Sequence, residues 1–405
     1  MKIALISDIH FGKDSRTKEF SVPGEEVFDE TTGAVSLEQG LIDVLKANEA
    51  EYLFIAGDLT SVGSPQEYYY CEKKMLEIAE KSNISKDNIV CSLGNHDIDW
   101  TVSNLHEIQC KDKSLTADVV SIIKDGYKKL SAVSPYIHLK ELGQYNQEVQ
   151  LPNVYVREYP DFIVFVLNTS WDCNPDQTTV SHGRLSNAQI DWFDKAAKPY
   201  NDDNRYKIVL MHHHPHQYAY AVHYFDCSMI EDGDEFLAVA AKNKINLILH
   251  GHRHHPTTKT IMQNGWSTPI TFLCAGSLSV NYKQRSESPN TIHIIDIKSD
   301  EKVIDLYNYE YSSSEGWKPF GKYSNEKPLD SKMHLGKIVT DDELDKLVDN
   351  CIKEKKAWKW DELPEEIRFR LFKDVNNSFK KIAGDAMAGE FPNLVYIISE
   401  EEVNK

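Results

Sequence analysis

The chain opens with the stretch MKIALISDIH (residues 1–10), in which the apolar run Ile3–Ile6 leads to Asp8 and His10. A short apolar run that gives way to polar residues is typical of a buried β-strand ending there. Asp8 and His10 are two residues apart, so at a strand end both side chains can turn toward one side. Asp8 also interrupts the apolar run too early for a signal-peptide core. We therefore expect this stretch to form the first strand of a sheet.

The same arrangement recurs at four later places. Apolar runs at 53–56, 89–91, 208–211 and 247–249 are followed by Gly57-Asp58, by Gly94-Asn95-His96-Asp97, by His212 and by Gly251-His252-Arg253-His254. In open α/β sheets, buried strands present the polar groups of a site at their carboxyl ends. We therefore expect these polar segments to meet at one edge of the fold.

Between the first strands the pattern turns helical. Ser36-Leu37-Glu38-Gln39 is a capping-box start for one helix, and a second helix is expected from Pro65 to about Lys81. This alternation predicts a parallel sheet with right-handed crossovers. Further strands are expected at 153–159, 162–167, 268–275, 291–297 and 303–309, with a helix at 185–197.

Two regions depart from the alternation. Residues 100–150 are polar, helical in pattern and without motif residues, so we interpret them as a helical insertion that could cap a site. Residues 312–405 begin with a turn-like stretch and continue with two amphipathic helices, from Thr340 and from Pro364. We therefore expect one domain at 1–311, then a linker and a helical C-terminal extension of unknown role at 312–405. The helices of this extension are a candidate subunit interface.

Composition limits the partners. The 405 residues are 41% hydrophobic and 27% charged, as in a soluble globular protein. No stretch approaches about 18 uncharged apolar residues, so no membrane span is expected. The seven cysteines are scattered without a Cys-x-x-Cys pair, which favours a reducing compartment and a cytoplasmic location. A net charge of −18 disfavours long nucleic acids, because their binding depends on lysine and arginine.

The polar segments supply what a site for two divalent metals needs. Such a site needs a carboxylate that bridges the ions, surrounded by imidazole and amide or carboxylate ligands. Asp58, at the tip of the second strand, is the natural bridging carboxylate, and Asn95 offers its amide oxygen to the second ion. Taken singly the segments are weak, because Gly-Asp and similar pairs are common turn sequences. Their fixed order and their positions at strand ends favour a metal site.

As a set, these motifs resemble the calcineurin-like metallophosphoesterase superfamily, whose pattern is Asp-x-His, Gly-Asp, Gly-Asn-His-Asp, a strand-end His and Gly-His-x-His. The match covers roughly residues 1–300. Gly57–Thr60, and Gly183–Ser186 with Gln189 and Trp192, resemble the branch of class III cyclic-nucleotide phosphodiesterases and glycerophosphodiesterases. The resemblance implies an α/β fold, a four-layer sandwich of two mixed β-sheets flanked by helices, to which the C-terminal helical extension is added.

The resemblance also implies a ligand set for each ion. The first ion would take Asp8, His10, Asp58 and His254, and the second would take Asp58, Asn95, His212 and His252. His96 would be catalytic and not a ligand: it would face the phosphate, stabilise charge in the transition state and protonate the leaving oxygen. Asp97 would orient His96.

The fourth motif departs from the pattern, because His212-His213-His214 offers three adjacent candidates. Strand alternation would place His212 and His214 on one face and His213 on the other. We assign His212, the first histidine after the apolar run, with His213 as the fallback. His216, Arg253 and His213 are the candidates for contacts to substrate phosphate.

The implied reaction is hydrolysis of a phosphodiester, such as a cyclic nucleotide or another small diester, or of a phosphomonoester. A hydroxide that bridges the two ions would attack phosphorus in line, and the ions (Mn, Fe, Zn or Ni) would stabilise the phosphate oxygens. The expected partner is therefore a small phosphoester, nucleotides included. Three alternatives stay open: a metal-dependent DNA nuclease with the same motif set, a protein phosphatase, and a non-catalytic scaffold.

Overall fold

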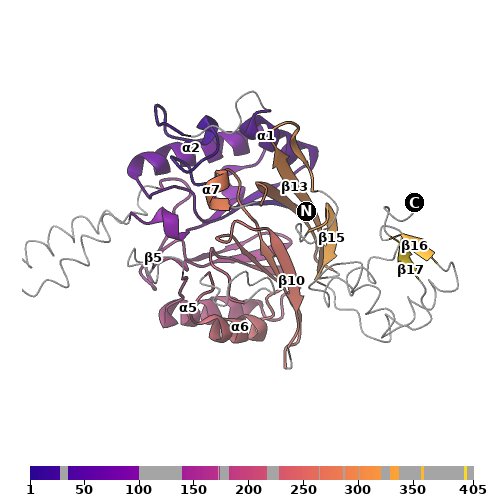
Figure 1. Ribbon diagram of the computed structural model, residues 1–405. Coiled ribbons are helices and arrows are strands. Elements are labelled where there is room, and N and C mark those ends of the chain that lie inside the picture. Colours follow the sequence, from indigo (N-terminus) through magenta and orange to yellow (C-terminus); the bar gives the residue numbers. More distant parts are fainter. Residues whose placement is uncertain are drawn as a thin grey trace, which may run out of the picture.

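Two β-sheets packed face to face form the centre of the molecule, with helices on both outer faces (Figure 1). The structure is a computed structural model. It describes residues 1–27, 35–99, 139–171, 173, 182–216, 228–263, 265–285, 288–300, 302–320, 329–336, 357–359 and 396–398.

The first sheet has the order β14-β13-β12-β1-β2-β3, and β15 also pairs with β13. Its strands are β1 (Lys2–Ile6), β2 (Tyr52–Ala56), β3 (Ile89–Ser92), β12 (Thr291–Lys298), β13 (Val303–Ser312), β14 (Gly316–Pro319) and β15 (Lys332–Leu335). β1, β2 and β3 are parallel to one another, whereas β12 runs antiparallel to β1 and to β13. The predicted parallel start is therefore confirmed, and the strands expected at 291–297 and 303–309 are present as the antiparallel pair β12 and β13.

The second sheet has the order β10-β11-β9-β8-β7-β6. Its strands are β6 (Tyr155–Glu158), β7 (Phe162–Val166), β8 (Tyr206–Leu210), β9 (Leu247–His250), β10 (Thr257–Ile261) and β11 (Ile270–Cys274). The four inner strands are parallel, and the two edge strands, β6 and β10, are antiparallel to their neighbours. Both sheets are therefore mixed, as predicted.

Helices form the two outer layers. α1 (Leu37–Ala47) and α2 (Pro65–Lys81) cover the first sheet, and α5 (Asn187–Ala197) and α6 (Gly233–Lys242) cover the second (Figure 1). Shorter elements are η1 (Lys18–Phe20), η2 (Lys86–Asn88), η3 (Asn95–Asp97), η5 (Lys198–Tyr200), α7 (Tyr282–Arg285), β4 (Tyr145–Asn146) and β5 (Leu151–Pro152). The predicted bounds of α2 agree with the structure because Ser64 caps its first turn and Pro65 begins it.

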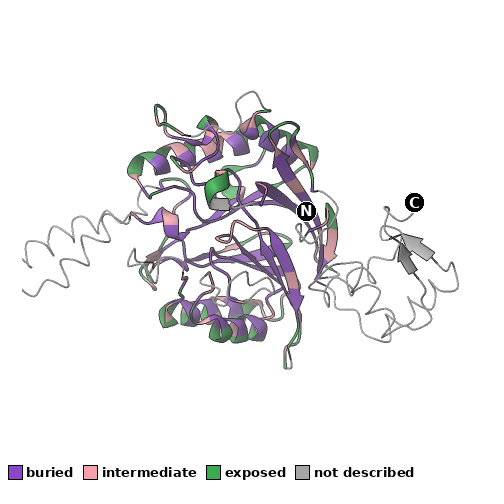
Figure 2. Cartoon of the chain, viewed as in Figure 1, coloured by how far each residue is buried: buried purple, intermediate pink, exposed green. Residues whose placement is uncertain are grey.

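Three apolar clusters hold the four layers together. The strand pleat divides β1 between two of them: Ile3 and Leu5 pack between the sheets, whereas Ala4 and Ile6 pack toward α1 and α2. The third cluster lies between the second sheet and α5 and α6. Figure 2 shows the resulting pattern, with buried strands inside and exposed helix faces outside.

Several predictions concern segments at the margins of this core. The first sheet continues past residue 311, because β14 and β15 both pair with β13. Most of the predicted insertion, residues 100–138, and the predicted helices from Thr340 and Pro364 lie outside the described residues. Beyond β15, the described residues form β16 (Ala357–Lys359) and β17 (Tyr396–Ile398), which pair in parallel. Among the described residues, no helix has the length and apolar character needed to cross a membrane.

Candidate metal centre

The carboxyl ends of strands from both sheets meet at one place. Within the first sheet, the backbone N–H of Asp8 donates to Gly57 O at 3.1 Å, and that of His10 donates to Asp58 O at 3.0 Å. The two sheets are joined here, because the backbone N–H of His252 donates to both carboxylate oxygens of Asp8 at 3.1 and 3.2 Å. The predicted meeting of the polar segments is therefore observed.

Four side chains form the first cluster: Asp8, His10, Asp58 and His254. One ligand atom from each lies within 4.8 Å of the others. His254 Nε2 is 3.2 Å from Asp8 Oδ1, and His10 Nε2 is 3.4 Å from Asp58 Oδ2. This cluster has the same members as the ligand set expected for the first ion.

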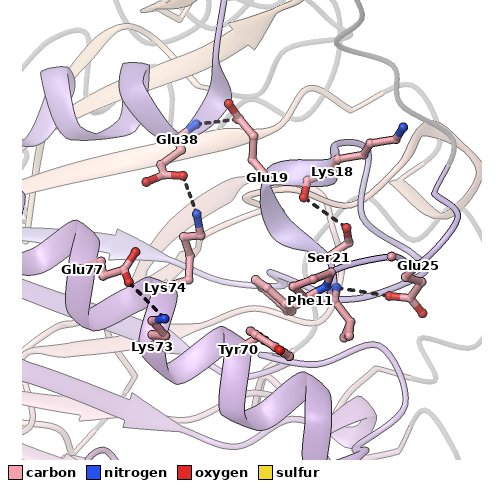
Figure 3. Close-up of a pocket in the computed structure, with 13 residues that line it drawn as sticks. Phe11, Lys18, Glu19, Ser21, Glu25, Glu38, Tyr70, Lys73, Lys74 and Glu77 are labelled. Carbon is pink, nitrogen blue, oxygen red and sulfur yellow. Dashed lines mark hydrogen bonds and ion pairs between the residues drawn. The ribbon is translucent and has the colours of Figure 1, made fainter.

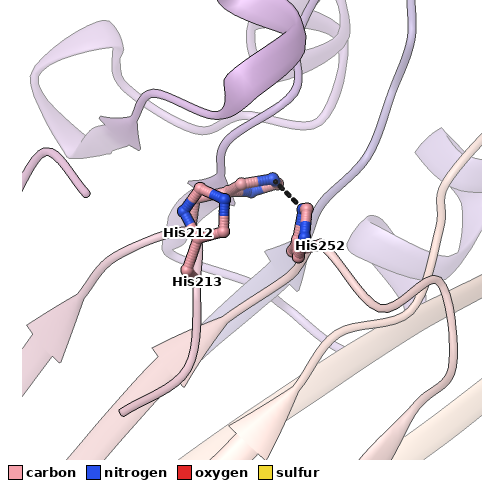
Figure 4. Close-up of side chains that lie close together, drawn as sticks. All are labelled: His212, His213 and His252. Carbon is pink, nitrogen blue, oxygen red and sulfur yellow. Dashed lines mark hydrogen bonds between the residues drawn. The ribbon is translucent and has the colours of Figure 1, made fainter. Parts of the chain in front are cut away.

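His212, His213 and His252 form the second cluster, again with ligand atoms within 4.8 Å of one another (Figure 4). His252 Nδ1 lies 3.2 Å from His212 Nε2. His212 Nδ1 is 2.7 Å from the carbonyl of Ala56, and this acceptor fixes a hydrogen on Nδ1, so that Nε2 is the ring nitrogen that faces the cluster. Such an outer carbonyl is the usual partner of a metal-binding histidine.

The face alternation expected for the three adjacent histidines is wrong. β8 ends at Leu210, so His212–His214 lie beyond the strand and its period of two no longer applies. His213 joins His212 in the cluster, with its Nδ1 2.8 Å from Thr169 Oγ1. His214 turns away: its Nε2 lies 2.8 Å from Ser228 Oγ.

Asp58 lies between the two clusters. Its Oδ2 is 3.4 Å from His10 Nε2 and 3.2 Å from His212 Nε2. Its other oxygen accepts a 2.8 Å hydrogen bond from the backbone N–H of His96. Asn95, the preceding residue, is 3% exposed and lies in η3. The position of Asp58 is the one expected of a carboxylate shared by two ions.

His96 and Asp97 make different contacts. The Nδ1 atom of His96 is 2.9 Å from the carbonyl oxygen of Ser61. The Asp97 carboxylate instead accepts from the backbone N–H of Gly94 at 2.8 Å and from the backbone N–H and hydroxyl of Thr60 at 3.0 and 3.1 Å. Its contacts thus join the loop after β2 to the loop after β3. The orientation of His96 by Asp97 stays a prediction.

A third group brings in a residue that the sequence did not point to. Ligand atoms of His10, Asp14 and His96 lie within 4.8 Å of one another. Asp14 is held there by its backbone, which donates to Ser61 Oγ at 3.2 Å and accepts from Asn281 N at 3.0 Å. No local pattern marks Asp14, because its position depends on a residue 267 places away.

The predicted phosphate contacts lie in different places. His213 is in the second cluster, and Arg253 lies half-buried in the loop between the paired histidines. The Nε2 atom of His216 lies 3.0 Å from Lys259 Nζ, and its ring packs 5.7 Å from that of Phe272 in the core beside α5 and α6. Phosphate binding by these residues stays a prediction.

Burial and neighbouring charges set the protonation of the cluster. Burial and the nearby His96 lower the pKa of His10 to about 4, and burial and His212 lower that of His252 to about 3. Burial opposes a charge on His212 as well, but the Asp58 carboxylate raises its pKa to about 9. Burial also opposes ionisation of Asp58, yet His212 and His96 hold the pKa of its carboxyl well below the usual range. A metal ion would bind the ionised carboxylate and take the place of the proton on His212.

Several cluster nitrogens are buried without a hydrogen-bond partner: His10 Nδ1, His213 Nε2 and His254 Nδ1. Buried polar atoms are nearly always hydrogen-bonded, so a group of them at one place needs an explanation. All of these atoms can offer a lone pair to a cation. The residues present therefore fit the two divalent metals that the motifs imply.

The glycines of the motifs lie against ligands from neighbouring strands. A Cβ atom on Gly94 would lie 2.1 Å from Asp58 Oδ1, and one on Gly251 would lie 2.5 Å from Asp8 Oδ2. A Cβ atom on Gly57 would lie 2.5 Å from His212 Nδ1. These contacts leave no room for a side chain, which explains why glycine stands at positions 57, 94 and 251, directly before Asp58, Asn95 and His252.

The backbone at the ligands is also unusual. Five of them have a positive φ: Asp8 (50°), His10 (47°), Asp58 (50°), His252 (70°) and His254 (54°). Residues with a side chain rarely adopt this left-handed conformation, and such strain gathers at functional sites.

A separate pocket of about 550 Å³ lies beside the loop after β1 and helix α2 (Figure 3). Charged side chains pair at its wall: Lys74 of α2 lies 2.5 Å from Glu38 of α1, and Lys73 lies 3.9 Å from Glu77 one turn further along α2. None of the predicted site residues lines it. The metal clusters are therefore not part of this pocket.

The chain matches one family model and is similar to several solved structures. The model of one family, calcineurin-like phosphoesterase, matches residues 1–256. Among solved structures, a dimetal phosphatase from Danio rerio is similar at 10% identity, covering 83% of this chain and 98% of that one, with a TM-score of 0.46. A purple acid phosphatase from yellow lupin (Lupinus luteus) seeds is similar at 16% identity, covering 78% of this chain and 52% of that one, with a TM-score of 0.49. No curated protein matches the sequence.

Proposed function

This chain belongs to the calcineurin-like phosphoesterase family, and we propose that it hydrolyses small phosphodiesters at its paired histidine and aspartate clusters. The family makes it a metallophosphoesterase, and its buried histidine and aspartate clusters are consistent with a dimetal site; the preference for diesters is the finer part of the proposal. The observation that carries it is the place of Asp58, whose Oδ2 faces His10 Nε2 at 3.4 Å and His212 Nε2 at 3.2 Å. One carboxylate thus serves both clusters.

Each cluster would hold one ion. The first ion would be held by Asp8, His10, Asp58 and His254, and the second by Asp58, Asn95, His212 and His252, with His213 as a further nitrogen beside it. When bound, two divalent ions supply an acidified water as nucleophile and stabilise the negative charge on the phosphate oxygens.

His96 supplies the proton for the leaving group. Its Nδ1 is occupied by the carbonyl of Ser61, so Nε2 is the ring nitrogen assigned to the substrate. As an imidazolium it donates the Nε2 proton to the oxygen that leaves phosphorus, which makes an alkoxide unnecessary.

The charge around the site supports a diester over a monoester. A diester carries one negative charge, whereas a monoester carries close to two at neutral pH. The half-buried carboxylate of Asp14 lies within 4.8 Å of nitrogens of His10 and His96, and the whole chain has a net charge of −18. Repulsion from these negative charges opposes the more highly charged substrate.

The test is a matrix of metals and substrates. The protein is stripped with a chelator, reloaded with Mn²⁺, Fe²⁺, Zn²⁺ or Ni²⁺, and assayed on bis-p-nitrophenyl phosphate, p-nitrophenyl phosphate, cyclic nucleotides, a short oligonucleotide and a phosphopeptide. We expect metal-dependent turnover with a higher kcat/KM on diesters than on the monoester, and loss of that turnover in Asp58→Asn.

Other outcomes would replace the proposal. A higher kcat/KM on the monoester or the phosphopeptide would indicate a phosphatase, and preferred cleavage of the oligonucleotide would indicate a nuclease. Inertness on every substrate with both ions bound would indicate a scaffold. Undiminished turnover in Asp58→Asn would overturn the assignment of the site.

A further inference from the structure

Glu67 is a buried acid that lies outside both metal clusters. It occupies the first turn of α2 and is 3% exposed. Its Oε2 accepts from the backbone N–H of Val62 at 3.0 Å and of Ser64 at 3.2 Å, while Ser64 Oγ accepts from the N–H of Glu67. A Cβ atom on Gly12 would lie 2.3 Å from Glu67 Oε1, so the loop after β1 covers the carboxylate.

The 60–64 loop that Glu67 holds contacts the catalytic histidine. Within it, the carbonyl oxygen of Ser61 lies 2.9 Å from His96 Nδ1. The hydroxyl of Ser61 donates to His10 O at 2.9 Å. Thr60 Oγ1 accepts from the backbone N–H of Gly63 at 3.1 Å, which adds a further internal tie. The loop is therefore fixed between the segment after β1 and the segment after β3.

The Ser61 carbonyl determines which ring nitrogen of His96 carries a hydrogen. A carbonyl oxygen only accepts hydrogen bonds, so the ring nitrogen that faces it must carry a hydrogen. A neutral imidazole has one N–H, and this contact places it on Nδ1. Nε2 is then the nitrogen assigned to proton exchange with the substrate, provided that the Ser61 carbonyl keeps its position.

We propose that Glu67 is a positioning residue for His96: by binding the backbone of Val62 and Ser64, it holds the Ser61 carbonyl against His96 Nδ1. The inference rests on the proposed function only in its assignment of His96 as the proton donor. Glu67 acts here as a hydrogen-bond acceptor of the right length, and its charge is not required. A glutamine keeps an acceptor oxygen at the same reach, whereas alanine removes it and aspartate withdraws it by one methylene.

The chain offers a matched control on the same helix. Glu72 is 6% exposed, and its carboxylate accepts from the backbone N–H groups of Lys140, Glu141 and Leu142 at 3.0, 2.8 and 2.8 Å. Glu72→Ala therefore removes a buried acid with comparable backbone bonds, but it releases residues 140–142 and not the 60–64 loop. A merely structural effect would be shared by the two alanine variants.

The first readout is the tautomer of His96 in the metal-free protein. Ring ¹H–¹⁵N spectra of ¹⁵N-histidine-labelled protein are recorded, and His96 is assigned by its loss in His96→Gln. We expect the Nδ1–H form in the wild type, in Glu67→Gln and in Glu72→Ala, and a shift toward the Nε2–H form in Glu67→Ala. Should Glu67→Ala not fold, Glu67→Asp takes its place, with the same shift expected.

The second readout is the dependence on the leaving group in the metal-loaded enzyme, measured on methyl aryl phosphates from p-nitrophenyl to phenyl. A proton donor matters most for the poorer leaving group, so Glu67→Ala should lower kcat about 10- to 100-fold on the phenyl ester and less than about threefold on the p-nitrophenyl ester, with KM unchanged. Glu67→Gln and Glu72→Ala should follow the wild type.

An Nδ1–H tautomer that persists in Glu67→Ala would overturn the proposal, as would Glu67→Gln behaving like Glu67→Ala. These outcomes are separate from a failure of the proposed function. A wild-type protein inert on all phosphoesters would refute the activity, while the tautomer spectra would still test the position of His96.

Discussion

Replacing Gly94 with alanine should damage the metal centre by steric contact alone. The backbone at Gly94 (φ −110°, ψ 179°) suits any residue, so the substitution adds no backbone strain. The new Cβ atom would lie 2.1 Å from Asp58 Oδ1 and 2.5 Å from the backbone nitrogen of Asp58. One of these contacts is with backbone, so no side-chain rotation relieves both. Asp58 must therefore move, which displaces its carboxylate from the position between the two clusters.

The size of the effect follows from that displacement. Ordinary van der Waals contact begins near 3.4 Å and the new contact would be 2.1 Å, so the carboxylate oxygen must move by about 1.3 Å. A misplacement of about 1 Å in an active site costs about 100-fold in rate. Overpacking a well-filled interior costs about 1–3 kcal/mol of the free energy of unfolding. We therefore expect Gly94→Ala to lower kcat/KM about 100-fold and to weaken the binding of both ions.

The assay pairs this variant with Gly24→Ala. Gly24 has a φ of +88°, and a Cβ atom added to it would meet no atom within 4 Å, so alanine there costs about 1 kcal/mol in backbone strain without touching the site. Thermal unfolding, isothermal titration with Mn²⁺ and turnover of bis-p-nitrophenyl phosphate are measured for both. Gly24→Ala should lose stability but keep metal binding and turnover. Wild-type metal affinity and turnover in Gly94→Ala would refute the reasoning.

Three further predictions concern single side chains. Asp58→Asn removes the charge that faces both clusters. Metal content measured by mass spectrometry should therefore fall below two ions per chain, and turnover should drop about 100-fold. A variant with two ions bound and full turnover would contradict this prediction. His212→Ala should weaken the binding of the second ion about 10-fold more than His213→Ala does, because of these two rings only that of His212 faces Asp58. Calorimetry that gives the reverse order would reassign the ligand. Burial raises the pKa of Glu67 from 4.5 to about 7, so between these pH values Glu67 is protonated in the folded protein and ionised in the unfolded chain. The free energy of unfolding should therefore fall by about 3 kcal/mol as the pH rises through this window. Glu67→Gln has no such group to titrate, so its free energy of unfolding relative to the wild type should increase from pH 5 to pH 8, measured by denaturant unfolding of the metal-free proteins. A difference that stays constant with pH would refute the buried-acid argument.

The strand ends could be predicted because two independent patterns coincide there. An apolar run indicates where a strand is buried, and the polar residue after it indicates where burial ends. Asp8, Asp58 and His252 follow this rule: Asp8 and Asp58 share one cluster, and the backbone N–H of His252 donates to the Asp8 carboxylate. Parallel pairing then makes neighbouring strand ends adjacent, which no single motif reveals.

The rest of the site depends on contacts that a linear pattern does not record. Ser61 meets His96 through a backbone carbonyl, which every residue type has, so its identity gives no signal. Glu67 resembles an ordinary helix cap in the sequence, and only the fold buries it against Gly12. The error at His212–His214 has a related cause, because the apolar run does not reveal that the strand, and its alternation, end at Leu210.

The left-handed backbone at five of the ligand residues has a consequence for anyone who engineers this protein. Each such residue carries about 1 kcal/mol or more of conformational cost that glycine would relieve. A selection for heat resistance alone would therefore favour glycine at Asp8, His10 and Asp58, and it would erase the activity while improving the scaffold. A selection carried out with metal present would instead favour variants that keep the ligands, because an ion that binds only the folded protein adds RT ln(1 + [L]/Kd) to its free energy of unfolding. Selection for thermal stability would therefore preserve the metal ligands only when the metal is supplied.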